Sequence, residues 1–186
     1  MSALRWPMRT ARNAVWSGGV IAYPTEAVFG LGCDPLNAAA VAKLLAIKHR
    51  DDAKGFILIA ANIIQLEPYI DVSDKLRDQL LMTWPGPITW VVPAAPGVPG
   101  WLTGGRATLA VRVTAHPVAQ ALCASTGFAL TSTSANLSSR PPIRSSLVVH
   151  HLLRDKLDYI MPGNVGSQRR PTEIRDALTG KILRAS

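Results

Sequence analysis

The helices predicted for this chain come from apolar residues that recur with the spacing of one helical face. In the best-formed case, Val41, Leu44 and Leu45 lie on one face. Asn37 can cap the first turn of this segment, and the pattern continues to Lys48. Glycine or proline marks the end of several such segments. The predicted helices cover Met8 to Ser17, Asn37 to Lys48, Ser73 to Thr83, Pro117 to Ser125 and Leu147 to Lys156.

Short apolar runs between these segments predict strands. Phe56 to Ala60 is continuously apolar, as expected of a strand that is covered on both faces. The other strands are predicted at Val20 to Tyr23, Ile88 to Val92, Thr108 to Val113, Phe128 to Ser132 and Tyr159 to Met161, with two more near Ile174 and Ile182. Ala94 to Gly105 holds two prolines and four glycines, which predicts a loop. Alternating strands and helices predict one α/β domain over residues 1–186, with a mixed sheet flanked by helices.

The charged residues add a prediction about ligands. No aspartate or glutamate occurs between Gln79 and Arg154, although Arg106, Arg112 and Arg144 lie in this stretch. Over the whole chain, 20 Lys+Arg against 12 Asp+Glu give a net charge of +8. Arginine suits planar, bidentate contacts with phosphate, whereas a solvated basic surface would explain the same composition without a ligand. The acid-free stretch favours a nucleotide or nucleic-acid site.

Cysteine usage and apolar run lengths indicate the compartment. Cys33 and Cys123 have no C-x-x-C spacing, so we expect free, buried thiols and no structural zinc site. The first residues lack the apolar run of a signal peptide. The longest apolar segment, Phe56 to Ile64, is too short to cross a bilayer. We therefore expect a cytoplasmic protein.

Three clusters of polar residues lie next to predicted strands, where open α/β sheets usually bind ligands. Tyr23 to Cys33 is interpreted as a strand that runs into a glycine-punctuated turn, and it matches neither a P-loop nor a GxGxxG motif. Lys48 to Gly55 places Lys54 just before an apolar strand. Ser132 to Ser138 is rich in hydroxyl groups. Each cluster alone is compatible with ordinary turn or helix-end chemistry, and the nearby arginines favour phosphate binding for the third.

Taken together, these segments resemble the YrdC/Sua5 family in its short, single-domain bacterial form. The matching segments cover nearly the whole chain: Gly19 to Asp34, the Lys48-x-Arg50 pair with Lys54, Trp84 to Thr89, Ala110 to Val113 with His116-Pro117, Ser132 to Ser138, and Pro171 to Gly180. Ser139-Arg140 departs from the pattern, because the family commonly has glycine after the serine-rich segment. The resemblance implies a twisted sheet over a large, positively charged concave cavity, without the extra C-terminal domain of longer members.

The resemblance also implies an activity. Members of this kind make L-threonylcarbamoyladenylate from L-threonine, bicarbonate and ATP, and release pyrophosphate. The product would serve N6-threonylcarbamoylation of adenosine 37 in tRNAs that read ANN codons, through downstream threonylcarbamoyl-transfer proteins. ATP would be a substrate and would carry Mg²⁺, with no resident metal. An acid-poor site fits this chemistry, because adenylation depends on positioning and charge neutralisation at phosphorus.

The resemblance assigns residues to three roles. The residues implied in catalysis are Lys48, Arg50 and Lys54. Those implied in threonine binding are Thr25, Lys54 and Thr89. Those implied in ATP binding are Lys48, Arg50, Arg112, Ser134 and Asn136.

Two other functions stay open from the sequence. A non-catalytic module could grip double-stranded RNA or tRNA through a basic concavity, and net charge does not separate it from an enzyme. A pure RNA binder, however, has no use for Thr25, Lys54 and a Ser134-x-Asn136 segment together. A carbamoyl-transfer accessory domain, of the kind found in hydrogenase-maturation proteins, is less favoured because zinc-finger-like cysteines are missing here.

Overall fold

The structure is a computed structural model that describes residues 5–49, 51–136, 141–168 and 170–186. Its strands are β1 (Ile21–Pro24), β2 (Phe29–Gly32), β3 (Ile57–Ala60), β4 (Ile88–Pro93), β5 (Thr108–Val113), β6 (Leu130–Ser134), β7 (Tyr159–Ile160), β8 (Glu173–Asp176) and β9 (Ile182–Arg184). Its α-helices are α1 (Arg5–Trp16), α2 (Ala38–Lys48), α3 (Asp74–Leu81), α4 (Gly100–Thr103), α5 (Pro117–Thr126) and α6 (Ser146–Leu153). Short 3-10 turns are η1 (Asp52–Lys54), η2 (Ile63–Gln65), η3 (Glu67–Tyr69) and η4 (Arg154–Lys156).

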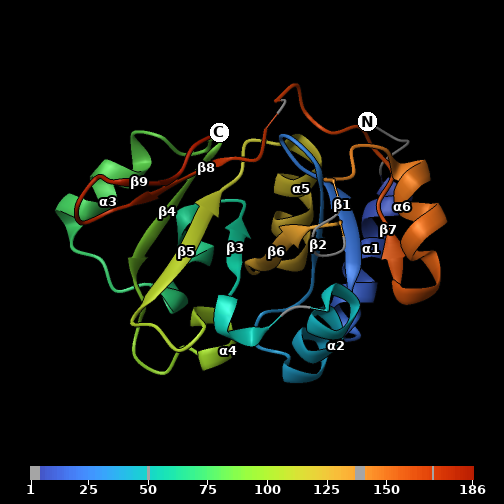
Figure 1. Cartoon of the computed structure of the whole chain (residues 1–186), viewed down its shortest axis with the longest axis horizontal. Coiled ribbons are helices and arrows are strands. Elements are labelled where there is room, and N and C mark those ends of the chain that lie inside the picture. Colours follow the sequence, from blue (N-terminus) through green and yellow to red (C-terminus); the bar gives the residue numbers. More distant parts are fainter. Residues whose placement is uncertain (1–4, 50, 137–140, 169) are drawn as a thin grey trace.

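The described strands form a single mixed sheet in the order β7-β1-β2-β6-β3-β5-β4-β8-β9. The pairs β1/β7, β3/β5 and β4/β8 are parallel, and the other neighbours are antiparallel. Figure 1 shows the sheet crossing the molecule from β9 to β7, with helices on both sides. The predicted α/β class with a mixed, helix-flanked sheet is confirmed.

Each face of the sheet carries its own hydrophobic core, because successive side chains of a strand point to opposite faces. Along β3, Leu58 packs into the larger core, which also holds buried residues of α2 and α6. Ile59 points the other way, into a core formed with α1 and α5. Ile57 lies on the same face as Ile59 but nearer the start of the strand, where it lines an open cavity.

Local sequence signals place several elements correctly. Asn37 caps α2, accepting a hydrogen bond from the Ala40 N–H. Ser73 caps α3 in the same way. Gly127 ends α5 in the left-handed conformation, at φ 85°, which glycine adopts without strain. The bounds of β5 are those predicted, Thr108 to Val113.

The glycine-rich segment after β1 was predicted wrongly. Phe29–Gly32 is a strand, β2, which pairs with both β1 and β6. A Cβ atom at Gly32 would lie 2.1 Å from the Thr131 carbonyl oxygen, so glycine is required here by a neighbouring strand. Because β2 pairs Gly30 with Ser134, β6 runs to Ser134 and not only to Ser132 as predicted.

Two further segments differ from the prediction. The proposed loop at Ala94 to Gly105 contains the short helix α4, and the Leu102 carbonyl accepts a hydrogen bond from the Phe56 N–H at 2.8 Å. This contact packs the segment against the start of β3. The predicted helix at Leu147 to Lys156 divides into α6 and the turn η4. In the part of the chain that is described, no helix combines the length and apolar character needed to cross a membrane.

The two cysteines agree with the prediction of free, buried thiols. Burial raises the pKa of the Cys33 thiol to about 11 and that of Cys123 to about 12. Both thiols are therefore protonated near neutral pH, and neither has the thiolate character of a nucleophile.

Candidate functional site

A cavity of about 430 Å³ opens on the face of the sheet that carries α5, beyond the Ile59 core. It is bordered by parts of β2 to β6 and by the C-terminal strands β8 and β9. The polar residues that line it are Thr25, Lys54, Thr103, Arg106, Thr108, Arg112, Ser132, Thr133, Ser134, Asn136, Thr172 and Arg184. Among the described residues that line the cavity there are four cations and no carboxylate. The lining therefore offers hydrogen-bond donors and positive charge, which suits anionic ligands.

Five of the predicted site residues meet in this cavity, although they lie on segments far apart in sequence. They are Thr25, Lys54, Arg112, Ser134 and Asn136. Of the other three predicted residues, Lys48 and Thr89 do not line the cavity, and Arg50 lies outside the described residues.

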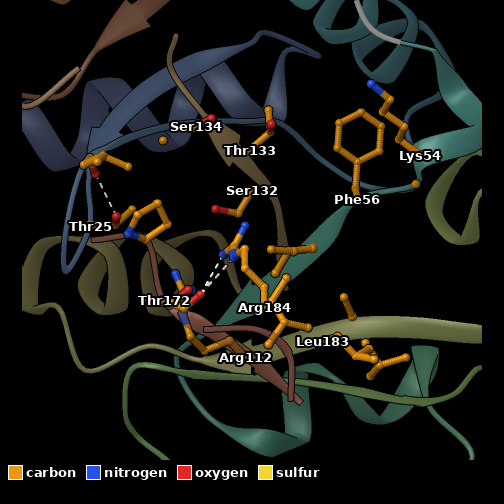
Figure 2. A pocket seen from close by; sticks show the side chains of 18 of the residues that line it. Thr25, Lys54, Phe56, Arg112, Ser132, Thr133, Ser134, Thr172, Leu183 and Arg184 are labelled. Atoms are coloured by element: carbon orange, nitrogen blue, oxygen red, sulfur yellow. Dashed lines mark hydrogen bonds between the residues drawn. The ribbon is translucent and has the colours of Figure 1, made fainter. Parts of the chain in front are cut away.

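Thr25 opens the turn between β1 and β2. Its Oγ1 donates a hydrogen bond to the Val28 carbonyl at 2.7 Å, and its N–H donates to the same carbonyl at 3.1 Å. This arrangement fixes the hydroxyl at the cavity edge (Figure 2). A threonine hydroxyl that donates one hydrogen bond can still accept others from a ligand.

Arg112 forms the most deeply buried charged part of the cavity wall, with only 4% of its surface exposed. Its Nη1 donates to Thr172 Oγ1 at 2.7 Å and to Thr89 Oγ1 at 3.3 Å. Its Nη2 lies 3.3 Å from Glu26 Oε2. Thr89 is fully buried, so its hydroxyl supports Arg112 from behind and does not line the cavity.

Glu26 is a buried carboxylate that the sequence interpretation did not assign to the site. Its Oε1 accepts hydrogen bonds from Thr114 Oγ1 at 2.6 Å and from the Ala115 N–H at 3.2 Å. Burial alone would raise its pKa, but the Arg112 guanidinium and the Thr114 hydroxyl outweigh this and hold the pKa of Glu26 below its ordinary value. Glu26 is thus ionised at neutral pH. Its position beside Thr25 was the one sequence signal that could have identified it.

Arg184, in the last strand, is a cavity residue that the sequence interpretation also missed. Its Nε and Nη2 donate to the Thr172 carbonyl at 3.2 and 2.7 Å. Burial against the cavity wall and the positive charge of Arg112 lower the pKa of Arg184. Figure 2 shows Arg112, Arg184 and Thr172 gathered at one side of the cavity, with Ser132 facing the same space. An isolated arginine in a closing strand gives no sequence signal of this role.

Lys54 lies at the other side of the cavity from Thr25, next to Phe56 (Figure 2). It ends the short turn η1, and Arg106 holds this turn in place. Arg106 Nη1 donates to the Ala53 carbonyl and Nη2 to the Lys54 carbonyl, each at 3.0 Å. The Lys54 backbone is therefore fixed to the segment before β5, while its side chain lines the cavity.

Lys48 occupies a different position from the one expected of a phosphate ligand. It is 4% exposed, and its ammonium donates to the Ser134 carbonyl at 2.5 Å and to the Asn136 carbonyl. It thereby joins the end of α2 to the end of β6. Arg50 lies outside the described residues, so its predicted role stays a prediction.

Arg144, a cation of the acid-free stretch, has structural contacts. Its Nη1 donates to the carbonyls of Ala27 and Gln168 at 2.6 and 2.5 Å, and its Nη2 to that of Gly166 at 3.3 Å. These bonds fasten the turn after β1 to the segment before β8. The acid-free stretch therefore supplies both cavity residues and residues that hold the cavity wall together.

The cavity thus has two cationic ends. One holds Arg112 and Arg184, and the other holds Lys54 and Arg106. The hydroxyl groups of Ser132 and Ser134 line the same cavity, on the strand that lies between β2 and β3 in the sheet. Such a site can bind two anionic groups at a defined separation and neutralise charge between them, a task of positioning and electrostatics. No group of three or more histidine, cysteine, aspartate or glutamate side chains among the described residues could hold a metal ion.

The chain is similar to known proteins over almost its whole length. The model of the Sua5/YciO/YrdC family, described as "Telomere recombination", matches residues 13–186. A threonylcarbamoyl-AMP synthase of Nitrosococcus oceani is 51% identical over 185 residues, which are 99% of this chain and 100% of the relative. A threonylcarbamoyl-AMP synthase of Alkalilimnicola ehrlichii is 52% identical over 184 residues, covering 97% and 96% of the two chains.

A solved structure from the same family has the same fold as this chain. Sua5 of P. abyssi, crystallised in complex with L-threonine, matches with a TM-score of 0.89 and 30% sequence identity, over 96% of this chain and 54% of that one. This chain therefore spans about half the length of that Sua5. The family resemblance inferred from the motifs is confirmed by these matches. The chain belongs to the Sua5/YciO/YrdC family.

Proposed function

We propose that this protein is an ATP-dependent nucleotidyltransferase that makes threonylcarbamoyl-AMP from L-threonine, bicarbonate and ATP. The observation that carries the proposal is a cavity with two separate cationic ends, in a chain about half identical to threonylcarbamoyl-AMP synthases. The reaction brings together two anionic substrates, an amino-acid carboxylate and a triphosphate. A cavity with one cationic end would place only one of them.

We assign the end with Arg112 to L-threonine, although the resemblance implies ATP binding for Arg112. A guanidinium binds a carboxylate through directed N–H bonds, and Ser132 and Thr172 line the same space. Thr25 lines the same cavity on the side opposite Lys54 (Figure 2), and we assign it to the polar groups of the amino acid. Thr89, predicted from the resemblance to bind threonine, acts in this assignment through Arg112, because its hydroxyl contacts that guanidinium at 3.3 Å.

We assign the other part of the cavity to ATP. Lys54, Ser134 and Asn136 provide an ammonium, a hydroxyl and an amide. The resemblance implies ATP binding for Ser134 and Asn136, whereas it implies threonine binding for Lys54, which this assignment gives to ATP. Arg184 lies beside Arg112 and can neutralise charge where the two substrates meet. Magnesium enters as part of the Mg–ATP substrate. The described lining has hydroxyl groups and cations but no carboxylate, so phosphate oxygens and water would hold the ion.

The chemistry proceeds in two steps. The amine of threonine takes up bicarbonate with loss of water and becomes a carbamate. A carbamate oxygen then attacks the α-phosphorus of ATP, a P–O bond forms, and the bond to pyrophosphate breaks. The residues of the cavity hold the carbamate in line with the α-phosphate and stabilise the charge that develops on the phosphoryl oxygens. The adenylate is then consumed by transfer of its threonylcarbamoyl group to N6 of adenosine 37 in tRNAs that read ANN codons.

The test is release of pyrophosphate by the purified protein with Mg–ATP. Release should require both L-threonine and bicarbonate, and mass spectrometry should find the threonylcarbamoyl adenylate. Omission of each substrate in turn provides the control, and Lys43→Met, a change on the outer surface of α2, should leave the rate unchanged. ATP turnover that is indifferent to threonine would contradict the proposal.

A further inference from the structure

Glu26 is a buried carboxylate that lies next to the cavity without lining it. Only 7% of the residue is exposed, and it is absent from the described lining. Both donors to its Oε1, Thr114 Oγ1 at 2.6 Å and the Ala115 N–H at 3.2 Å, belong to the segment that follows β5. Its second oxygen, Oε2, faces Arg112 Nη2 at 3.3 Å. The carboxylate therefore joins the turn after β1 to the arginine of β5.

Arg112 is restrained on several sides by these contacts. Thr172 and Thr89 accept from Nη1, and Glu26 faces Nη2. The Nε atom of Arg112 is buried and has no hydrogen-bond acceptor among the described residues. Because Arg112 lines the cavity, its guanidinium forms part of the wall that a ligand would meet, in an orientation set by these contacts.

The restraint matters because a guanidinium can rotate about its flexible stem. Arg112 also lies beside a second guanidinium, that of Arg184, whose like charge favours separation of the two. A carboxylate behind Arg112 opposes this separation and compensates the buried positive charge. The orientation of Arg112 thus depends on a residue that does not itself line the cavity.

We propose that Glu26 is a positioning residue for threonine recognition, whose carboxylate holds the Arg112 guanidinium in the orientation in which it lines the threonine end of the cavity. Glu26 acts through Arg112 and does not contact the substrate. This inference rests on the proposed function, in particular on the assignment of L-threonine to the Arg112 end of the cavity.

The test is the variant Glu26→Gln, which keeps the shape of the side chain and an oxygen acceptor for Thr114 but removes the charge. The KM values for L-threonine and for ATP are measured separately from adenylate formation. The KM for threonine should rise about 10- to 100-fold, as for the loss of one charge-assisted contact. The KM for ATP should change less than about 3-fold, since Lys54 and Ser134 lie elsewhere. Glu67→Gln, which removes an exposed partner of Arg77, is the matched control and should alter neither value.

Two further variants keep the test decisive if Glu26→Gln folds poorly. Thr114→Val removes one donor to Glu26 without changing any charge, and it should raise the KM for threonine selectively by a smaller factor. Glu26→Gln combined with Arg112→Met removes both buried charges, so it should regain thermal stability without regaining threonine affinity. Selective loss of threonine affinity supports the inference. An equal rise in both KM values, or no rise, in the folded variants overturns it.

The outcome also separates this inference from the proposed function. If the wild-type protein forms no adenylate and calorimetry detects no threonine binding, the proposed function is wrong. If the wild-type protein is active and Glu26→Gln and Thr114→Val bind threonine normally, only the positioning role is wrong.

Discussion

Replacing Lys48 with methionine should lower the thermal stability of the protein even when no ATP is bound. The Lys48 ammonium is buried and donates to the carbonyls of Ser134 and Asn136. Methionine fills a similar volume but donates no hydrogen bond, so these two carbonyls lose a charged donor. The expected result follows from the cost of partly buried acceptors that lose their partner.

A buried polar group left without its partner costs about 1–3 kcal/mol, so two carbonyls give a loss of roughly 2–4 kcal/mol once some water reaches the end of β6. For a chain of this size, each kcal/mol lowers the melting temperature by about 2–4 °C, which predicts a decrease of about 4–16 °C. Lys43→Met is a matched control on the same helix. Lys43 pairs with Asp158 at 2.6 Å, but its side chain is 43% exposed, and exposed pairs contribute only about 0.2–1 kcal/mol.

The assay is thermal unfolding followed by circular dichroism, without ATP and then with saturating Mg–ATP. Lys48→Met should melt well below Lys43→Met in the absence of ATP. ATP affinity should also fall, because Ser134 and Asn136 lose the contact that fixes them. The opposite pattern, normal stability without ATP combined with weak ATP binding, would refute this reasoning. It would show instead that Lys48 contacts phosphate directly, as the resemblance implied.

Three further predictions follow from the site and the charge. Ser134→Ala and Asn136→Ala should each weaken ATP binding about 10- to 150-fold, because each removes a hydrogen bond to a charged phosphate worth about 1.5–3 kcal/mol. Calorimetry measures this affinity, and an unchanged value would leave both residues with a structural role only. The pKa of Glu26 is depressed in the folded protein, so its stabilisation is complete above the unfolded value of about 4.3 and is lost as the pH falls below it. Urea unfolding between pH 6 and about pH 3 should therefore show a steeper acid loss for the wild-type protein than for Glu26→Gln, and equal slopes would contradict the assigned pKa. Any tRNA binding should weaken log-linearly with rising salt and discriminate little between sequences, whereas adenylate formation should need no tRNA; selective binding that survives high salt would contradict this.

Sequence signals were sufficient to predict a helix or strand where its physical cause lies within a few residues. The Asn37 cap of α2 is a side chain bonded to an N–H three residues away, and Gly127 ends α5 through its own backbone conformation. The alternation of apolar runs gave the α/β class and nearly all the strands, because burial on a sheet follows directly from side-chain polarity. The ordered motifs identified the family, since each one marks a segment that meets the others in the fold.

Tertiary structure decided everything that depends on partners distant in sequence. Phe29–Gly32 resembled a turn because the reason for Gly32 is the backbone of β6, which the local sequence does not contain. Arg184 enters the cavity only because β9 closes the sheet beside β8.

The contacts of the charged residues in the site also depend on partners that are distant in sequence. Glu26 and Thr114 are 88 positions apart, and Lys48 and Ser134 are 86 apart. The resemblance implied that Lys48 contacts ATP, but motifs could not distinguish contact with a ligand from contact with the cavity-lining segment that holds Ser134 and Asn136. The sequence determined which chemical groups are available. Only the folded chain determined which of them face each other and which face the cavity, because a hydrogen bond depends on distance and direction in space.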